Sequence, residues 1–178
     1  MFRVKDPKVS LDFYTRIIGM SLLSEKKFDD FTLYFLAFDS ENKFDSLSAE
    51  ERAKEVWSRE GILELTHNHG TESDPEFKGY SSGNSDPGKG FGHIAVSVED
   101  VEKACARFEQ LGVTFKKKLT DGKMRHIAFI LDPDGLGFSD ANVKIFYDAY
   151  GEENQPLYIN KADDSQEIDV HTLFDTRP

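Results

Sequence analysis

The first forty residues alternate between helical and strand-like hydrophobic patterning. Asp6-Pro7 can begin a helix, because Asp6 can cap the first turn and Pro7 needs no backbone donor there. Apolar residues then recur at helical spacing, at Leu11, Tyr14 and Ile18. Gly19 supplies a left-handed helix end, and the apolar, aromatic run 32–38 predicts a buried strand. The predicted order is helix, glycine, strands.

The same order returns in the second half of the chain. An amphipathic helix is predicted from Val101, Ala104, Cys105, Phe108 and Leu111. Gly112 ends it, and 127–131 predicts another strand. Gly19 and Gly112 lie 93 positions apart, and the same offset relates Phe35 to Ala128. A shared offset indicates an internal duplication.

The remaining segments complete each half. The polar stretch 39–60 reads as an insertion, with Ser48 to Glu51 as a possible capped helical turn. Further strands are predicted at 61–66, 90–97 and, from alternation, 143–147. We therefore expect an α+β fold with one domain over 1–150, divided into module one (1–70), a Gly/Ser/Asp-rich linker (71–89) and module two (90–150). Residues 151–178 are acidic and poor in apolar residues, which predicts a disordered tail.

Composition narrows the class of protein. The chain has 178 residues, of which 38% are hydrophobic, enough for a core. A net charge of -11 argues against general nucleic-acid binding, so any anionic ligand needs a local cluster of cations. No apolar run is long enough for a membrane span, and the N-terminus does not resemble a signal peptide. The single cysteine, Cys105, fits a core position in a cytoplasmic protein.

Two ionisable residues fall inside apolar strands. Period two places Glu64 on the face opposite Leu63 and Leu65, and His93 on the face opposite Ile94 and Val96. A carboxylate and an imidazole among apolar neighbours are costly unless partnered, and a divalent metal is one such partner. A strand glutamate or histidine is more often a solvent-facing or hydrogen-bonded residue, so the spacing alone leaves both interpretations open.

Several motifs, in order, resemble the glyoxalase I (lactoylglutathione lyase) family of eukaryotes, and the resemblance covers residues 1–135. They are Arg3-Val4-Lys5-Asp6-Pro7 through Leu11-Asp12-Phe13-Tyr14, Leu63-Glu64-Leu65-Thr66-His67-Asn68, Gly83-Asn84-Ser85-Asp86-Pro87, Gly90-Phe91-Gly92-His93-Ile94, Asp121-Gly122-Lys123-Met124 and Asp132-Pro133-Asp134-Gly135.

The resemblance implies a vicinal-oxygen-chelate fold of paired βαβββ modules, assembled as a homodimer with active sites at the subunit interface. One Zn²⁺ per site would be shared between subunits, and Glu64 and His93 match two of its family ligands. The implied reaction converts the glutathione-methylglyoxal hemithioacetal to S-lactoylglutathione. A Lewis acid stabilises the enediolate while a carboxylate, here Glu64, moves the proton.

Glutathione is anionic, and family positions for binding it are matched by a further set of residues: Arg3, Asn68, Lys89, Lys117, Lys123 and Met124. Lys89 stands near the place where the family has an arginine, and it keeps the charge but not the bidentate fork. The competing interpretation of each lysine is ordinary solvated surface.

The pattern departs from the family at two ligands. Ser139 stands where the family has its last glutamate, and replacement by Asp140 would need a register slip that turns the side chain over. The offset counterpart of His93, which the family fills with glutamine, would precede Met1. We therefore expect impaired activity from a chain that begins too late to supply that ligand.

Two other functions compete with the lyase. A catalytically inactive glutathione-conjugate-binding protein would keep the cations and lose the metal. A ring-cleaving iron dioxygenase of the same superfamily would need two histidines and a carboxylate, for which His67 and His69 are the candidates.

Overall fold

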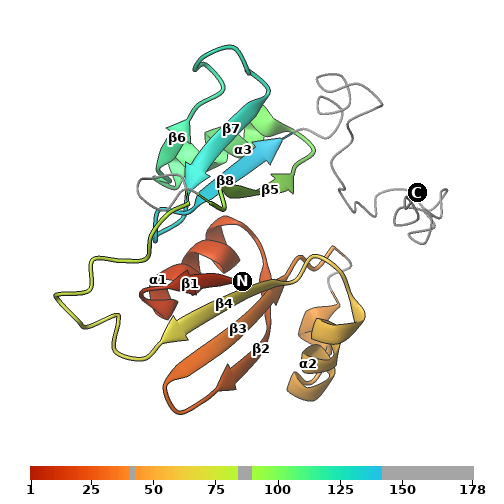
Figure 1. Ribbon diagram of the computed structural model, residues 1–178. Coiled ribbons are helices and arrows are strands. Elements are labelled where there is room, and N and C mark those ends of the chain that lie inside the picture. Colours follow the sequence, from red (N-terminus) through yellow and green to blue (C-terminus); the bar gives the residue numbers. More distant parts are fainter. Residues whose placement is uncertain (41–42, 84–89, 142–178) are drawn as a thin grey trace, which may run out of the picture.

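The computed structural model describes residues 1–40, 43–83 and 90–141, which form two four-stranded sheets of identical topology. The first sheet has the order β1-β4-β3-β2, from Phe2–Val4, Leu63–Asn68, Phe31–Ala37 and Ser21–Lys27. The second has the order β5-β8-β7-β6, from His93–Ser97, Gly137–Ala141, Ile127–Leu131 and Phe115–Lys117. In each sheet the first pair in this order is parallel and the other pairs are antiparallel. The predicted fold of paired βαβββ modules is confirmed (Figure 1).

Each module carries its helix after the first strand, as the sequence predicts. Helix α1 (Pro7–Asp12) is capped by Asp6, whose carboxylate accepts from the Lys8 amide at 2.9 Å, and it continues as a π-helical turn, Phe13–Ile17. Helix α3 (Val101–Gln110) is capped in the same way by Asp100. Gly19 and Gly112 have φ of 92° and 72°, a conformation that favours glycine and ends both helices.

The insertion forms more structure than a single turn. Ser48 and Glu51 make a reciprocal capping box that begins α2 (Ala49–Ser58), preceded by a 3-10 turn at Phe44–Ser46. The helix packs beside β2 at the outer side of the first sheet (Figure 1). Its satellite core consists of Leu23, Phe35, Ala37, Phe44 and Val56. The insertion therefore covers part of the sheet face that carries Phe35.

The two halves share one main core. Buried residues of the first half, such as Tyr14 and Leu65, form a cluster with Phe108 and Ile130 of the second. Arg107 of α3 also donates to the backbone carbonyls of Arg16 and Ile17 at the end of the first helical segment. The modules are thus held together by apolar burial and by polar contacts at their junction.

The last described strand lies just before the segment in which alternation predicts one. Strand β8 forms at Gly137–Ala141, whereas the alternating segment 143–147 lies outside the described residues, as does the predicted tail. Pairing with β5 and β7 forms β8 even though its sequence does not alternate. The predicted module and linker boundaries stay predictions. In the part of the chain that the structure describes, no helix is long and apolar enough to cross a membrane.

Candidate active site

Glu64 lies in the middle of β4, on the face opposite the main core. Leu63 and Leu65 on either side are buried, whereas Glu64 is half-buried, so the predicted alternation is confirmed. Its register partner on β3 is Phe35. The Thr66 hydroxyl lies 3.5 Å from the carboxylate, at the limit of a hydrogen bond. Among the described residues, the Glu64 carboxylate has no closer hydrogen-bond partner than this hydroxyl.

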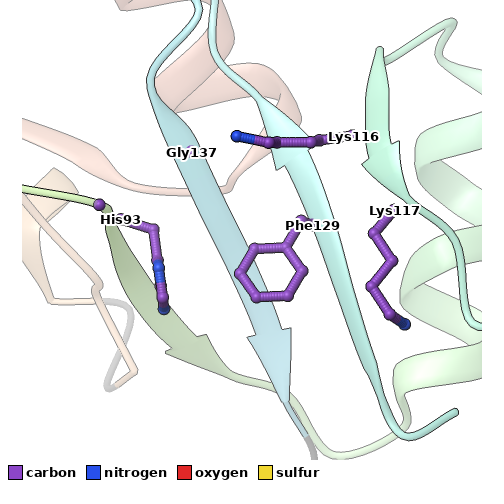
Figure 2. A pocket seen from close by; sticks show the side chains of 6 residues that line it. His93, Lys116, Lys117, Phe129 and Gly137 are labelled. Atoms are coloured by element: carbon purple, nitrogen blue, oxygen red, sulfur yellow. The ribbon is translucent and has the colours of Figure 1, made fainter. Parts of the chain in front are cut away.

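His93 begins β5 and is exposed. Its ring packs edge-on against Phe129 of β7, with 5.0 Å between ring centroids, and both lie over the same face of the second sheet (Figure 2). They border a pocket of about 400 Å³ lined by Gly92, His93, Lys116, Lys117, Phe129 and Gly137. The imidazole therefore faces an open, partly basic pocket from the edge of its sheet.

The backbone register shows to which face of the second sheet residues 139 and 140 belong. Ser139 pairs with Ala95 of β5 and with Phe129 of β7, while Asp140 pairs with Val96 and Ala128. Cross-strand partners share a face, so residue 139 belongs to the His93 face and residue 140 to the other.

Two predicted glutathione-binding residues come together at the edge of the first sheet. Arg3 of β1 donates through Nη1 to the Asn68 Oδ1 at 3.3 Å. The Asn68 Nδ2 donates to the Tyr80 hydroxyl at 3.1 Å. A second pocket, of about 310 Å³, lies here and is lined by Met1, Phe2, Arg3, Tyr80, Ser81 and Leu136. Sequence reasoning missed Tyr80, because it lies in the stretch interpreted only as a linker.

The Lys117 ammonium contacts the backbone of its own loop. Its ammonium donates to three backbone carbonyls, those of Lys118 (3.1 Å), Met124 (2.6 Å) and Ile127 (2.7 Å). Lys123 and Met124 are exposed on the loop that these bonds close. Lys117 therefore holds the loop between β6 and β7, and Lys123 and Met124 are presented to solvent. Lys89 lies outside the described residues.

His67 and His69 are both committed to hydrogen bonds within the fold. The His67 Nε2 lies 2.7 Å from the Glu72 carboxylate. The His69 ring contacts the Thr32 hydroxyl at 2.9 Å and the Asp29 carbonyl at 3.2 Å. Within residues 1–40, 43–83 and 90–141, no group of three or more His, Cys, Asp or Glu could hold a metal ion. These contacts give the iron dioxygenase interpretation no support.

Glu64 and His93 are the right types of ligand for a zinc ion, but two ligands are too few. Carboxylate and imidazole are both common zinc ligands, and catalytic zinc sites use three protein ligands. The two residues lie on different sheets of one chain. A zinc site built on them therefore requires further ligands, from a second copy or from residues beyond the described part.

A family model described as the "Glyoxalase/Bleomycin resistance protein/Dioxygenase superfamily" matches residues 1–139. The chain belongs to this superfamily. The predicted resemblance to glyoxalase I is confirmed by relatives within it. The chain is 52% identical to the lactoylglutathione lyase of Pseudomonas putida over 139 residues, covering 76% of this chain and 78% of that protein. It is also 52% identical to the lactoylglutathione lyase of Schizosaccharomyces pombe over 136 residues, which is 75% of this chain and 43% of the yeast protein.

Solved glyoxalase structures share the fold. The Leishmania major glyoxalase I, described as trypanothione-dependent, superposes with a TM-score of 0.58 at 28% identity, covering 83% of this chain and 87% of that one. Glyoxalase I from Zea mays superposes with a TM-score of 0.55 at 28% identity, covering 79% of this chain and 42% of that one. This glyoxalase chain thus spans less than half of the maize and fission yeast proteins.

Proposed function

We propose that this glyoxalase chain is a lactoylglutathione lyase, which converts the hemithioacetal of glutathione and methylglyoxal to S-lactoylglutathione. The observation that carries the proposal is the 52% identity to a lactoylglutathione lyase over 139 residues. The exposed imidazole of His93 and the half-buried carboxylate of Glu64 add support, because metal-assisted proton transfer needs both kinds of group. The single cysteine supports a cytoplasmic location.

The proposed cofactor is one Zn²⁺ per site, held by Glu64 of one subunit and His93 of the other in a homodimer. Placement of the two donors on separate sheets supports sharing between subunits. When bound, the metal would act as a Lewis acid on the substrate oxygens.

The chain's own residues would bind the tripeptide and move the proton. Arg3 and Asn68 offer a cation and an amide at one edge of the first sheet. Lys117, Lys123 and Met124, together with Lys89, would bind the rest of the ligand. Glu64 would also take the proton from one carbon of the substrate and return it to the next, because a carboxylate can act as a general base as well as ligate a metal; among the described residues its nearest hydrogen-bond partner is the Thr66 hydroxyl at 3.5 Å.

One observation favours a second candidate function. Residue 139, which lies in register with Phe129 on the His93 face, is serine and not a carboxylate. The Arg3–Asn68–Tyr80 contacts are nevertheless intact. A protein that binds glutathione conjugates without turning them over would have this combination.

Two measurements on the purified full chain separate these functions. The lyase should bind zinc, form thioester from hemithioacetal in an ultraviolet assay, and lose about a hundredfold or more in rate on Glu64→Gln. A zinc-free chain that binds S-methylglutathione but forms no thioester would instead establish the binding protein. Glu50→Gln, on the exposed side of the insertion, is a control for loss of a carboxylate.

A further inference from the structure

The hydrogen-bonded chain Arg3–Asn68–Tyr80 has a fixed direction. A guanidinium can only donate, so the Asn68 atom that faces Arg3 must be the amide oxygen. The Asn68 nitrogen is therefore the atom that faces Tyr80, and it donates to the phenol oxygen at 3.1 Å. The Tyr80 hydroxyl accepts in this contact, and its own proton is not used by Asn68.

Tyr80 lies at a pocket. Tyr80 and Arg3 both line the 310 Å³ pocket at the edge of the first sheet. The other lining residues are apolar, apart from Ser81. The pocket thus brings together a permanently charged guanidinium and a phenol whose hydroxyl is oriented to donate outward from Asn68. Two such donors suit a carboxylate, which has two acceptor oxygens.

The ring of Tyr80 is held in place by a neighbouring aromatic ring. It packs edge-on against Phe77 with 4.9 Å between centroids. The backbone carbonyl of Phe77 accepts from the Lys5 ammonium at 3.1 Å, which ties this part of the chain to the end of β1. The phenol is therefore preorganised, and binding a ligand does not carry the full entropic cost of ordering it.

We propose that Tyr80 is a ligand-binding residue, whose hydroxyl donates to a carboxylate of glutathione alongside Arg3. The inference rests on the proposed function for the identity of the ligand. Tyr80 acts twice, because it accepts from Asn68 and so fixes the orientation of that amide as well. Glutathione has two carboxylates, and both present the same chemistry to the pocket.

The test is calorimetric binding of S-methylglutathione to the full chain. Tyr80→Phe keeps the ring and removes only the hydroxyl, and it should raise the dissociation constant by about tenfold. Tyr34→Phe, which removes a phenol hydroxyl from a buried position on β3, should leave binding unchanged. Unchanged melting temperature of Tyr80→Phe would show that its loop still folds.

Repeating the substitution in an Asn68→Ala variant distinguishes direct contact between Tyr80 and the ligand from a role of Tyr80 in orienting Asn68. If Tyr80 only orients Asn68, Tyr80→Phe should have no effect once Asn68→Ala has removed the amide. Direct donation predicts a further loss of severalfold in that background. Equal binding by Asn68→Ala and the double variant, or by wild type and Tyr80→Phe, would overturn the inference.

A modified ligand shows which of the two glutathione carboxylates accepts from Tyr80. With the glycyl carboxylate blocked as an ethyl ester, the effect of Tyr80→Phe should vanish if that group is the acceptor and persist if the γ-glutamyl carboxylate is. Failure of the proposed function gives a different result. If the wild type binds S-methylglutathione but forms no thioester from the hemithioacetal, only the proposed lyase activity is contradicted. If the wild type does not bind S-methylglutathione, both proposals are contradicted.

Discussion

At the scale of single residues, position 139 is where a catalytic role can be tested by substitution. Its register partners, Ala95 and Phe129, place it on the face that carries His93. A glutamate there would add a negatively charged oxygen ligand beside an imidazole, which is the type of donor that zinc prefers. It would also add a second proton-transferring group.

Ser139→Glu is therefore expected to raise the rate of thioester formation by roughly 10²- to 10⁴-fold, the usual contribution of a positioned general base. Zinc content, measured on the same preparation, should rise as well. Ser139→Gln is the matched control, because glutamine has nearly the same size and can ligate a metal but cannot take a proton. Equal rates for the two variants would contradict a catalytic role for this position.

Single residues also show which part of the candidate site can be predicted from the sequence. Glu64 and His93 were found from the strand period and from short motifs, both of which are local in sequence. Tyr80 was missed because its significance comes from Asn68 and Arg3, which approach it only when β1 pairs with β4. Hydrogen-bond partners that fold together from distant segments leave no local pattern.

At the scale of elements, the loop between β6 and β7 depends on the donors of one ammonium group. Lys117 reaches the carbonyls of Met124 and Ile127 across the loop, and Lys118 pairs with Glu109 of α3 at 2.6 Å. The exposed residues Lys123 and Met124 are thus presented on a closed backbone. Their position relative to the 400 Å³ pocket follows from Lys117, which also lines it.

Lys117→Arg should open this loop although it keeps the charge. A planar guanidinium cannot direct its donors at three converging carbonyls as an ammonium can. Loss of two or three hydrogen bonds of about 1 kcal/mol each should raise the open population by roughly tenfold or more. Tryptic cleavage after Lys123, followed by mass spectrometry, measures that population.

Lys116→Arg is the control, because Lys116 lies beside the same pocket and is exposed. Equal cleavage rates for Lys117→Arg and Lys116→Arg would show that the carbonyl contacts do not hold the loop.

The elements themselves were predicted to the extent that their patterns are local. Both helices, the Asp6 cap and the two glycine ends were predicted correctly, because Asp6, Gly19 and Gly112 act within a few residues of their positions. Strand β8 was not predicted, because its sequence has no alternation and it forms by pairing with β5 and β7. Pairing with strands that are distant in sequence therefore determines where β8 forms.

At the scale of the whole molecule, a buried carboxylate joins the two modules. The Tyr14 hydroxyl, at the end of the first helical segment, donates to the Asp132 Oδ2 at 2.7 Å. The other oxygen accepts from the amides of Asp134 (3.0 Å) and Leu136 (2.7 Å), which leads directly into β8. Asp134 in turn accepts from the Lys5 amide and the Ser10 hydroxyl. The junction and the start of the last strand therefore depend on Asp132.

Burial raises the pKa of Asp132 from 3.8 to about 6, although the Tyr14 and backbone hydrogen bonds oppose the shift. Burial and the nearby negative charge raise the pKa of Tyr14 also, so its hydroxyl remains a donor. A carboxyl whose pKa is higher in the folded state binds its proton more tightly there. Its contribution to stability is full below pH 3.8 and is lost as the pH rises through 6.

Asp132→Asn removes this titration while its amide can still accept from Leu136. We compare the free energy of unfolding of the wild type with that of the variant. The wild type should gain about 2 kcal/mol relative to the variant between pH 7 and pH 4. This is most of what a shift of roughly two pKa units can contribute. Urea denaturation at both pH values measures the difference. Asp12→Asn should show the opposite sign, because its hydrogen bond to Arg16 lowers the pKa of Asp12 and its contribution is lost as the pH falls. If the difference between wild type and Asp132→Asn stays constant between the two pH values, the Asp132 carboxyl has the same pKa in the folded and unfolded states, and burial does not raise it.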